Sequence, residues 1–109
     1  MEYSSLLDEG AKQTDPYKRM AYIAAFAVSM YSSSAYRAST KPFNPVLGET
    51  FECTRDERGW KFMAEQISHH PPSAVCVCSH KQWDYQQEVT LKNKFWGKSL
   101  EAIPEGYIQ

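Results

Sequence analysis

Two adjacent histidines followed by two adjacent prolines, at residues 69–72, constrain this chain more than any other stretch. Each proline fixes its own φ angle, lacks a backbone donor and drives the preceding residue into extended geometry. Side chains of a regular strand point alternately to opposite faces, so His69 and His70 can reach one ligand only where a strand bends or ends. The prolines favour such an end. We therefore predict a strand that stops at a stiffened histidine pair.

The histidine pair offers hydrogen-bond donors. A neutral imidazole donates one N–H, and a protonated imidazole donates two. A rigid pair of this kind suits an anionic oxygen group such as a phosphate. The alternative for a His-His pair taken by itself is a loop whose rings face solvent.

Composition excludes several classes of function. The chain has 109 residues, which is the size of one small domain with a single core. Its net charge is −1, with acidic and basic residues interspersed, so it lacks the electrostatic signature of a nucleic-acid-binding protein. An odd set of cysteines, Cys53, Cys76 and Cys78, indicates reduced thiols in a cytosolic protein. No signal peptide is visible, and the apolar run at 22–30 is shorter than the roughly 20 residues of a membrane helix.

Two helices are expected within residues 4–36. Ser5, with Asp8 three positions later, resembles a capping box, and Asp15 followed by Pro16 is a stronger helix start. The following residues are rich in Ala, Met, Ile and Tyr on adjoining faces. This pattern predicts a second helix that is buried on more than one side.

Period-2 alternation then predicts five strands within residues 48–103, at 49–55, 60–68, 73–79, 83–91 and 95–103, the last closed by Pro104. Residues 56–59 form a hairpin loop that ends in glycine. Short turns between strands favour an antiparallel meander. The predicted fold class is α+β, with the N-terminal helices packed on this meander.

A second polar loop precedes the first strand. Pro42 and Pro45 exclude a helix there, and they hold Lys41 and Asn44 on a stiff backbone. Lys41 supplies a positive point charge, while Asn44 supplies a donor and an acceptor. Stiffness lowers the entropic cost of ordering a loop around a ligand. Without further context, however, a single loop lysine is usually just solvated.

Two chemical alternatives remain open on the residues alone. Glu65, His69 and His70 allow a hydrolytic site to be drawn, but neither a nucleophile elbow nor a Gly-rich oxyanion loop accompanies them. We favour a role for Glu65 and Gln66 in hydrogen-bonding the loop that carries the histidines.

The second alternative is a metal site. Cys76, Cys78 and His80 share one face of a strand, and His69 or His70 could complete a zinc site, although this spacing is uncommon for zinc. Small cysteines lining a sheet interior are the favoured interpretation, so we predict no metal and no cofactor.

Three segments carry a resemblance to a known family. Residues 65–72, EQISHHPP, closely resemble the signature motif of the oxysterol-binding protein-related family of lipid-transfer proteins. The blocks KPFNPVLGET at 41–50 and KFWGKS at 94–99 are similar to two further family segments, in the same order. The likeness covers nearly the whole chain.

The resemblance implies a non-enzymatic lipid-binding domain within a β-barrel. It implies that phosphatidylinositol 4-phosphate is exchanged between membranes for a sterol or phosphatidylserine. The residues implied to bind the lipid headgroup are Lys41, Pro42, Phe43, Asn44, His69 and His70. His69 and His70 would grip the 4-phosphate.

The resemblance also concerns where the chain sits in its domain and in the cell. It implies that residues 1–109 are the N-terminal part of the ligand-binding domain, with a lid before Met1 and more barrel strands after Gln109. The last strand would then lie at an unpaired edge. The protein would be cytosolic and peripheral at organelle membranes and membrane contact sites.

Overall fold

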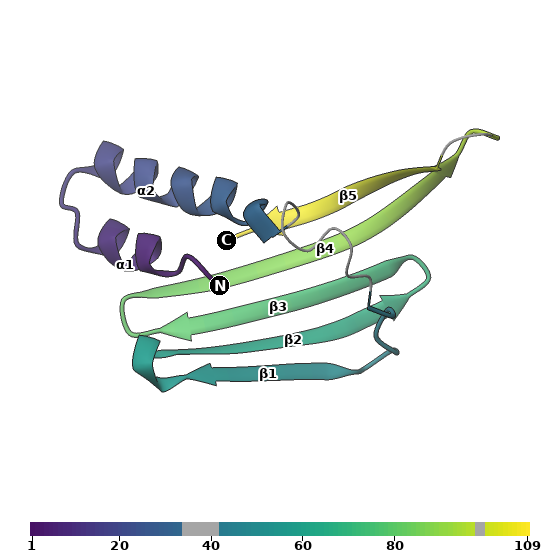
Figure 1. Cartoon of the computed structure of the whole chain (residues 1–109), viewed down its shortest axis with the longest axis horizontal. Helices are drawn as coiled ribbons and strands as arrows, with labels where there is room; N and C mark the ends of the chain where they lie inside the picture. The colour runs from purple at the N-terminus through teal and green to yellow at the C-terminus, as the bar shows by residue number, and fades with distance from the viewer. Residues whose placement is uncertain (34–41, 98–99) are drawn as a thin grey trace. The chain divides into compact units, whose positions relative to one another are not determined.

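The computed structural model describes residues 1–33, 42–97 and 100–109, which include two α-helices, one short 3-10 helix and five strands. The chain divides into two compact units, residues 1–43 and 44–109, which are treated separately below. Figure 1 labels the elements of both units. Lys41 falls outside the described residues.

The first unit contains α1 (Ser5–Ala11) and α2 (Pro16–Ser29). Asp15 caps α2 as predicted, because its carboxylate accepts the backbone N–H of Tyr17 at 2.9 Å and Pro16 occupies the first turn. The predicted capping box at Ser5 is wrong: Ser4 is the N-cap and makes no side-chain cap hydrogen bond. At Gly10, an added Cβ would lie 3.1 Å from the Cβ of Tyr22, so glycine permits close approach of the two helices.

The burial predicted for the second helix is also wrong within the described residues. Phe26 is its one buried side chain there, whereas the other large apolar side chains of the helix stay accessible. Tyr17 and Met20, for example, are exposed. The apolar pattern identified a helix, but a pattern does not require that every apolar side is covered within one chain.

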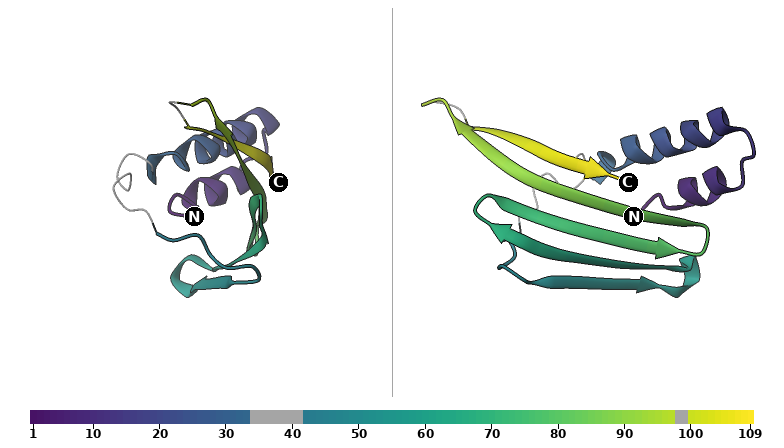
Figure 2. Two further views of the ribbon diagram at one scale, coloured as in Figure 1. Left: turned by 90° about the vertical axis from the view of Figure 1, so that its right-hand side faces the viewer. Right: turned by 180° about the vertical axis from the view of Figure 1, so that it is seen from behind.

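The second unit is a five-stranded antiparallel sheet with the order β1-β2-β3-β4-β5, which confirms the predicted meander. Its strands are β1 (Thr50–Arg55), β2 (Trp60–His69), β3 (Pro72–His80), β4 (Trp83–Phe95) and β5 (Leu100–Ile108). A short 3-10 helix, η1 (Asp56–Arg58), and Gly59 at φ 71° make the predicted hairpin loop. Figure 2 shows the sheet as a twisted, curved layer.

Cross-strand register assigns side chains to the two faces of the sheet. One row runs Cys53–Phe62–Cys78–Tyr85 across β1 to β4, and its face, called the Tyr85 face, carries most of the buried side chains of the sheet. The row Thr50–Glu65–Val75–Glu88 lies on the opposite face, called the Glu88 face. The alternation predicted from the sequence therefore separates an apolar face from a largely polar one.

The last two strands differ from their predicted bounds. β4 extends to Phe95, and β5 runs through Pro104 to Ile108 instead of stopping at Pro104. Proline is accepted because β5 lies at an edge of the described sheet, where one side of the strand needs no ladder donor.

Polar residues can occupy positions 92–94 of β4 because β4 pairs with β3 only as far as Thr90. Beyond that point β4 and β5 continue as a two-stranded ribbon, which Figure 1 shows projecting past the other strands.

Gly106 tests the placement of β5. Its φ is 148°, and an added Cβ would lie 1.9 Å from the carbonyl oxygen of Glu88, so Gly106→Ala must push β5 away from β4. We expect a loss of at least about 3 kcal/mol in the free energy of unfolding of the complete protein that carries this chain. Gly97→Ala is the control, because Gly97 also has a positive φ (75°) but open space around it. It should cost only about 1–2 kcal/mol. Equal losses in denaturant titrations would contradict the described register.

Candidate functional site

The histidine pair lies where the prediction placed it, at the end of a strand. His69 is the last residue of β2 and pairs with Pro72, the first residue of β3, so His70 and Pro71 form the turn between the two strands. The His70–Pro71 peptide bond is cis. The two imidazole rings are exposed, with centroids 4.6 Å apart and planes at 65°. Their N–H groups are thus close enough to donate to different oxygens of one phosphate-sized group.

A β-bulge decides which face His69 occupies. Gln66 pairs with Ala74, but Ser68 pairs with Ser73, so Ile67 is an extra residue in β2. Before the bulge the even-numbered residues of β2 lie on the Tyr85 face, and after it the odd-numbered ones do. His69 consequently shares the Tyr85 face, whereas an unbulged strand would place it on the Glu88 face. This bulge was not predicted from the sequence.

Backbone hydrogen bonds hold the loop of the KPFNPVLGET segment (41–50) beside β2, the strand that leads into the EQISHHPP segment (65–72). The backbone N–H of Gly48 donates to the carbonyl of Gln66 at 2.8 Å, and the N–H of Gln66 donates to the carbonyl of Glu49 at 3.1 Å. The carboxylate of Glu49 also accepts the N–H of Val46 at 2.9 Å, which closes the turn at 46–49. Gly48 adopts φ 78°, a left-handed conformation that favours glycine. These bonds bring residues from the two motifs side by side.

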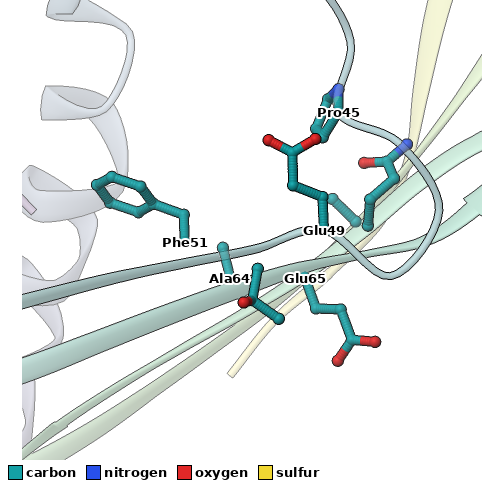
Figure 3. Close-up of a pocket in the computed structure, with 8 residues that line it drawn as sticks. Pro45, Glu49, Phe51, Ala64 and Glu65 are labelled. Carbon is teal, nitrogen blue, oxygen red and sulfur yellow. The ribbon is translucent and has the colours of Figure 1, made fainter.

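Gln66 has the supporting role that the sequence predicted. Its side chain is buried, and its Nε2 donates to the carbonyl of Ser68 at 2.9 Å, directly before the histidines. Glu65 differs: it borders a small cavity, but its side chain lies on the Glu88 face and points away from that of Glu49 in Figure 3. The prediction that this pair supports the histidine loop is therefore confirmed for Gln66, whereas the Glu65 side chain lies on the opposite face of the sheet.

The cavity has a volume of about 100 Å³ and is lined by both motifs. Figure 3 shows Pro45 and Glu49 on one side of it, with Phe51, Ala64 and Glu65 on the strands. Small-molecule sites usually enclose about 300–1,000 Å³. This cavity is large enough for part of a ligand, so a lipid bound here needs further walls.

The remaining predicted headgroup residues are only partly placed. Asn44 is exposed in the second unit, at the start of the loop that reaches Pro45. Pro42 and Phe43 are exposed in the first unit, and Lys41 lies outside the described residues. The structure joins the loop after Asn44 to the strand before His69. The roles of these residues in binding stay predictions.

The zinc alternative does not fit the strands. Cys76, Cys78 and His80 do share the Tyr85 face, but Cys76 and His80 are four residues apart, about 13 Å along β3, too far for both to bind one ion. His69 lies opposite Pro72, roughly 26 Å from His80 along β3. Among the described residues, no three His, Cys, Asp or Glu side chains converge as metal ligands would.

Burial explains the state of the thiols. It raises the pKa of Cys78 to about 11 and also raises the pKa of Cys76, because the thiolate would lose its hydration. Burial likewise raises the pKa of Tyr85 to about 12, and its hydroxyl donates to Oε1 of Gln87 at 2.7 Å. These groups are therefore neutral at physiological pH. They lie on the Tyr85 face of the sheet, where Cys78 and Tyr85 are buried and Cys76 is half-buried.

Comparisons with known proteins agree with the motifs. Residues 1–109 match the family described as oxysterol-binding protein. The chain is 56% identical to oxysterol-binding protein-related protein 6 of Homo sapiens over 108 residues, covering 99% of this chain and 12% of that protein. It is 55% identical to oxysterol-binding protein-related protein 3 of Homo sapiens over 106 residues, covering 97% and 12%. The chain thus spans roughly an eighth of the length of these relatives.

Solved structures give the same result for the fold. The chain resembles the Osh3 ORD of Saccharomyces cerevisiae, solved in complex with PI(4)P, at a TM-score of 0.82 and 38% identity, covering 98% of this chain and 28% of that one. It resembles the Osh1 ORD, solved in complex with cholesterol, at 0.84 and 39%, covering 98% and 26%. The fold is that of a lipid-binding domain, present here as two helices and an open sheet. The chain belongs to the oxysterol-binding protein family.

Replacing Glu49 tests whether its carboxylate holds the turn at 46–49. Glu49→Ala removes the acceptor for the N–H of Val46, so this amide should exchange with solvent up to about fivefold faster, equivalent to about 1 kcal/mol. Hydrogen exchange followed by mass spectrometry on the complete protein reports this. Glu52→Ala, at an exposed glutamate in β1, should leave the loop unchanged. Unaltered exchange at Val46 in Glu49→Ala would show that the turn does not depend on this hydrogen bond.

Proposed function

We propose that this chain contributes the phosphate-binding part of a lipid-transfer site for phosphatidylinositol 4-phosphate. The observation that carries the proposal is the histidine pair, whose exposed rings lie 4.6 Å apart at a strand end. A rigid donor pair loses little conformational entropy when it binds an anion. The Osh3 ORD, whose fold the chain shares, was solved with this lipid.

The second motif supplies the other side of the proposed site. The hydrogen bonds from Gly48 and Gln66 hold the loop after Asn44 beside the β2 strand. Asn44 and Lys41, which belong to the same motif, would contact the glycerophosphate and inositol region, with Pro42 and Phe43 completing the loop. In this proposal the cavity of about 100 Å³ holds only a part of the headgroup, and other parts of the domain enclose the rest.

The proposed activity is non-enzymatic exchange of lipids between membranes. Phosphatidylinositol 4-phosphate would be exchanged for a sterol or phosphatidylserine, by a cytosolic protein that is peripheral at organelle membranes and membrane contact sites. The Osh1 ORD, solved with cholesterol, supports a sterol as a possible counter-lipid. None of the helices in the described residues is long and apolar enough to cross a bilayer. A hydrolytic or metal-dependent role has no comparable support.

Replacing both His69 and His70 with Ala tests the phosphate assignment. Hydrogen bonds to a charged group contribute about 1.5–3 kcal/mol each, so losing two should weaken binding by roughly two to four orders of magnitude. Extraction of phosphatidylinositol 4-phosphate from vesicles by the complete protein should fall accordingly. His80→Ala, at the opposite end of the sheet, is the control and should retain extraction. Normal extraction by the double variant would refute the assignment.

Lys41 can distinguish the two counter-lipids. A sterol presents one hydroxyl, whereas phosphatidylserine presents a phosphate and a carboxylate, so the charge of Lys41 matters mainly for phosphatidylserine. Lys41→Ala should therefore reduce phosphoinositide transfer and any phosphatidylserine transfer about tenfold or more, and leave sterol transfer nearly unchanged. Lys61→Ala, at an exposed lysine on the Glu88 face, serves as the matched control. Intact phosphoinositide transfer in Lys41→Ala would mean that this loop does not bind the headgroup.

A further inference from the structure

Three apolar side chains lie exposed next to the histidine pair. Val46 and Leu47 are each 66% exposed, and Ile67 is 44% exposed. Together these residues are called the apolar rim. Single exposed apolar residues are common in proteins, but a group of them at a binding site indicates a surface that contacts something apolar.

Backbone hydrogen bonds hold the apolar rim together. The turn that carries Val46 and Leu47 ends at Gly48, whose N–H donates to the carbonyl of Gln66, the residue before Ile67. Ile67 is the extra residue of the bulge and has no opposite partner in β3. The turn and the bulge are thus adjacent, at the end of the sheet where β2 meets β3 (Figures 1 and 2).

The three side chains of the apolar rim are uncharged, and so are the residues directly beside them in sequence, Pro45, Gly48, Gln66 and Ser68. Two exposed acidic residues lie one position further away. The carboxylate of Glu49 accepts the N–H of Val46 within the turn, and Glu65 lies on the Glu88 face. Because the rim side chains carry no charge themselves, they can enter an interfacial region without the cost of burying a charged group.

We propose that the apolar rim docks this end of the sheet on a phospholipid bilayer, with its side chains at the boundary between headgroups and acyl chains. The proposal rests on the proposed function, because a lipid that is extracted must leave a bilayer. Docking through the rim would hold the imidazoles of His69 and His70 at the level of the headgroups. Its occupant is the zwitterionic lipid surface itself, since the rim offers apolar area and no net charge.

Vesicles that lack the ligand test the docking directly. We would measure flotation of the complete protein that carries this chain with phosphatidylcholine vesicles containing no phosphoinositide. The double change Val46→Ser and Leu47→Ser, and separately Ile67→Ser, should each weaken partitioning by about tenfold or more. Met63→Ser is the matched control, because Met63 is also in β2 and is 43% exposed but pairs with Glu52 and Val77 in the middle of the sheet. Unchanged partitioning of the rim variants, or an equal loss with Met63→Ser, would overturn the proposal.

Failure of the proposed function is measured separately, with a short-chain, water-soluble phosphatidylinositol 4-phosphate and no bilayer. The rim variants should bind this probe as the unmodified protein does, while their transfer between vesicles falls. If the unmodified protein does not bind the probe, the headgroup assignment fails, but the vesicle comparison still decides the docking. If the rim variants lose binding of the probe as well as partitioning, the rim belongs to the ligand site and the docking proposal is wrong.

Tryptophan fluorescence provides a second measurement of docking, one that does not depend on a loss of binding. Leu47→Trp should place a new indole in the interfacial region, so its fluorescence contribution over the unmodified protein should shift to shorter wavelength when phosphatidylcholine vesicles are added. Met63→Trp should show no shift. The absence of a shift at position 47 would contradict insertion of the rim.

Discussion

Two backbone hydrogen bonds, from Gly48 to Gln66 and from Gln66 to Glu49, determine how the two halves of the candidate site meet. Backbone groups make these bonds, so they fix a register between a loop and a strand whatever ligand is present. The side chains of Glu49 and Gln66 then each complete a local turn, one at Val46 and the other at Ser68. A loop and a histidine pair that are separated in sequence are thereby held side by side.

Rigidity at this surface agrees with the chemistry proposed for it. Proline follows the histidines and precedes the Val46 turn, so few backbone torsions remain to be ordered when an anion binds. The middle of the Tyr85 face has a different chemical environment. Cys78 and Tyr85 are buried and neutral there, and the raised pKa of each reflects the lost hydration of its charged form. The exposed histidine pair thus lies at a strand end, whereas most of the buried side chains of the sheet lie along the Tyr85 face.

Much of this arrangement could be predicted from the sequence, because its signals are local. Alternation indicated the strands, Asp15 and Pro16 indicated the start of a helix, and the prolines indicated the end of β2 at His69. The bulge and the overhang of β4 and β5 could not be predicted. Both depend on pairing between strands, and the alternation within a single strand carries no information about that pairing. The same limit applies to Glu65 and Gln66, because the face of the sheet that each one occupies decides that only Gln66 bonds the carbonyl of Ser68.

Because Ile67 is an extra residue in β2, the face that His69 occupies depends on whether the number of residues before it in the strand is odd or even. Each residue added to or removed from β2 between Trp60 and His69 would exchange the two faces for everything that follows, until another bulge compensates. Length changes of one residue in this strand should therefore be far more disruptive than most substitutions. A change of two residues would preserve the facing of His69 but would shift its position along β3. The spacing between Trp60 and the histidines is consequently as much a part of the motif as the residues themselves.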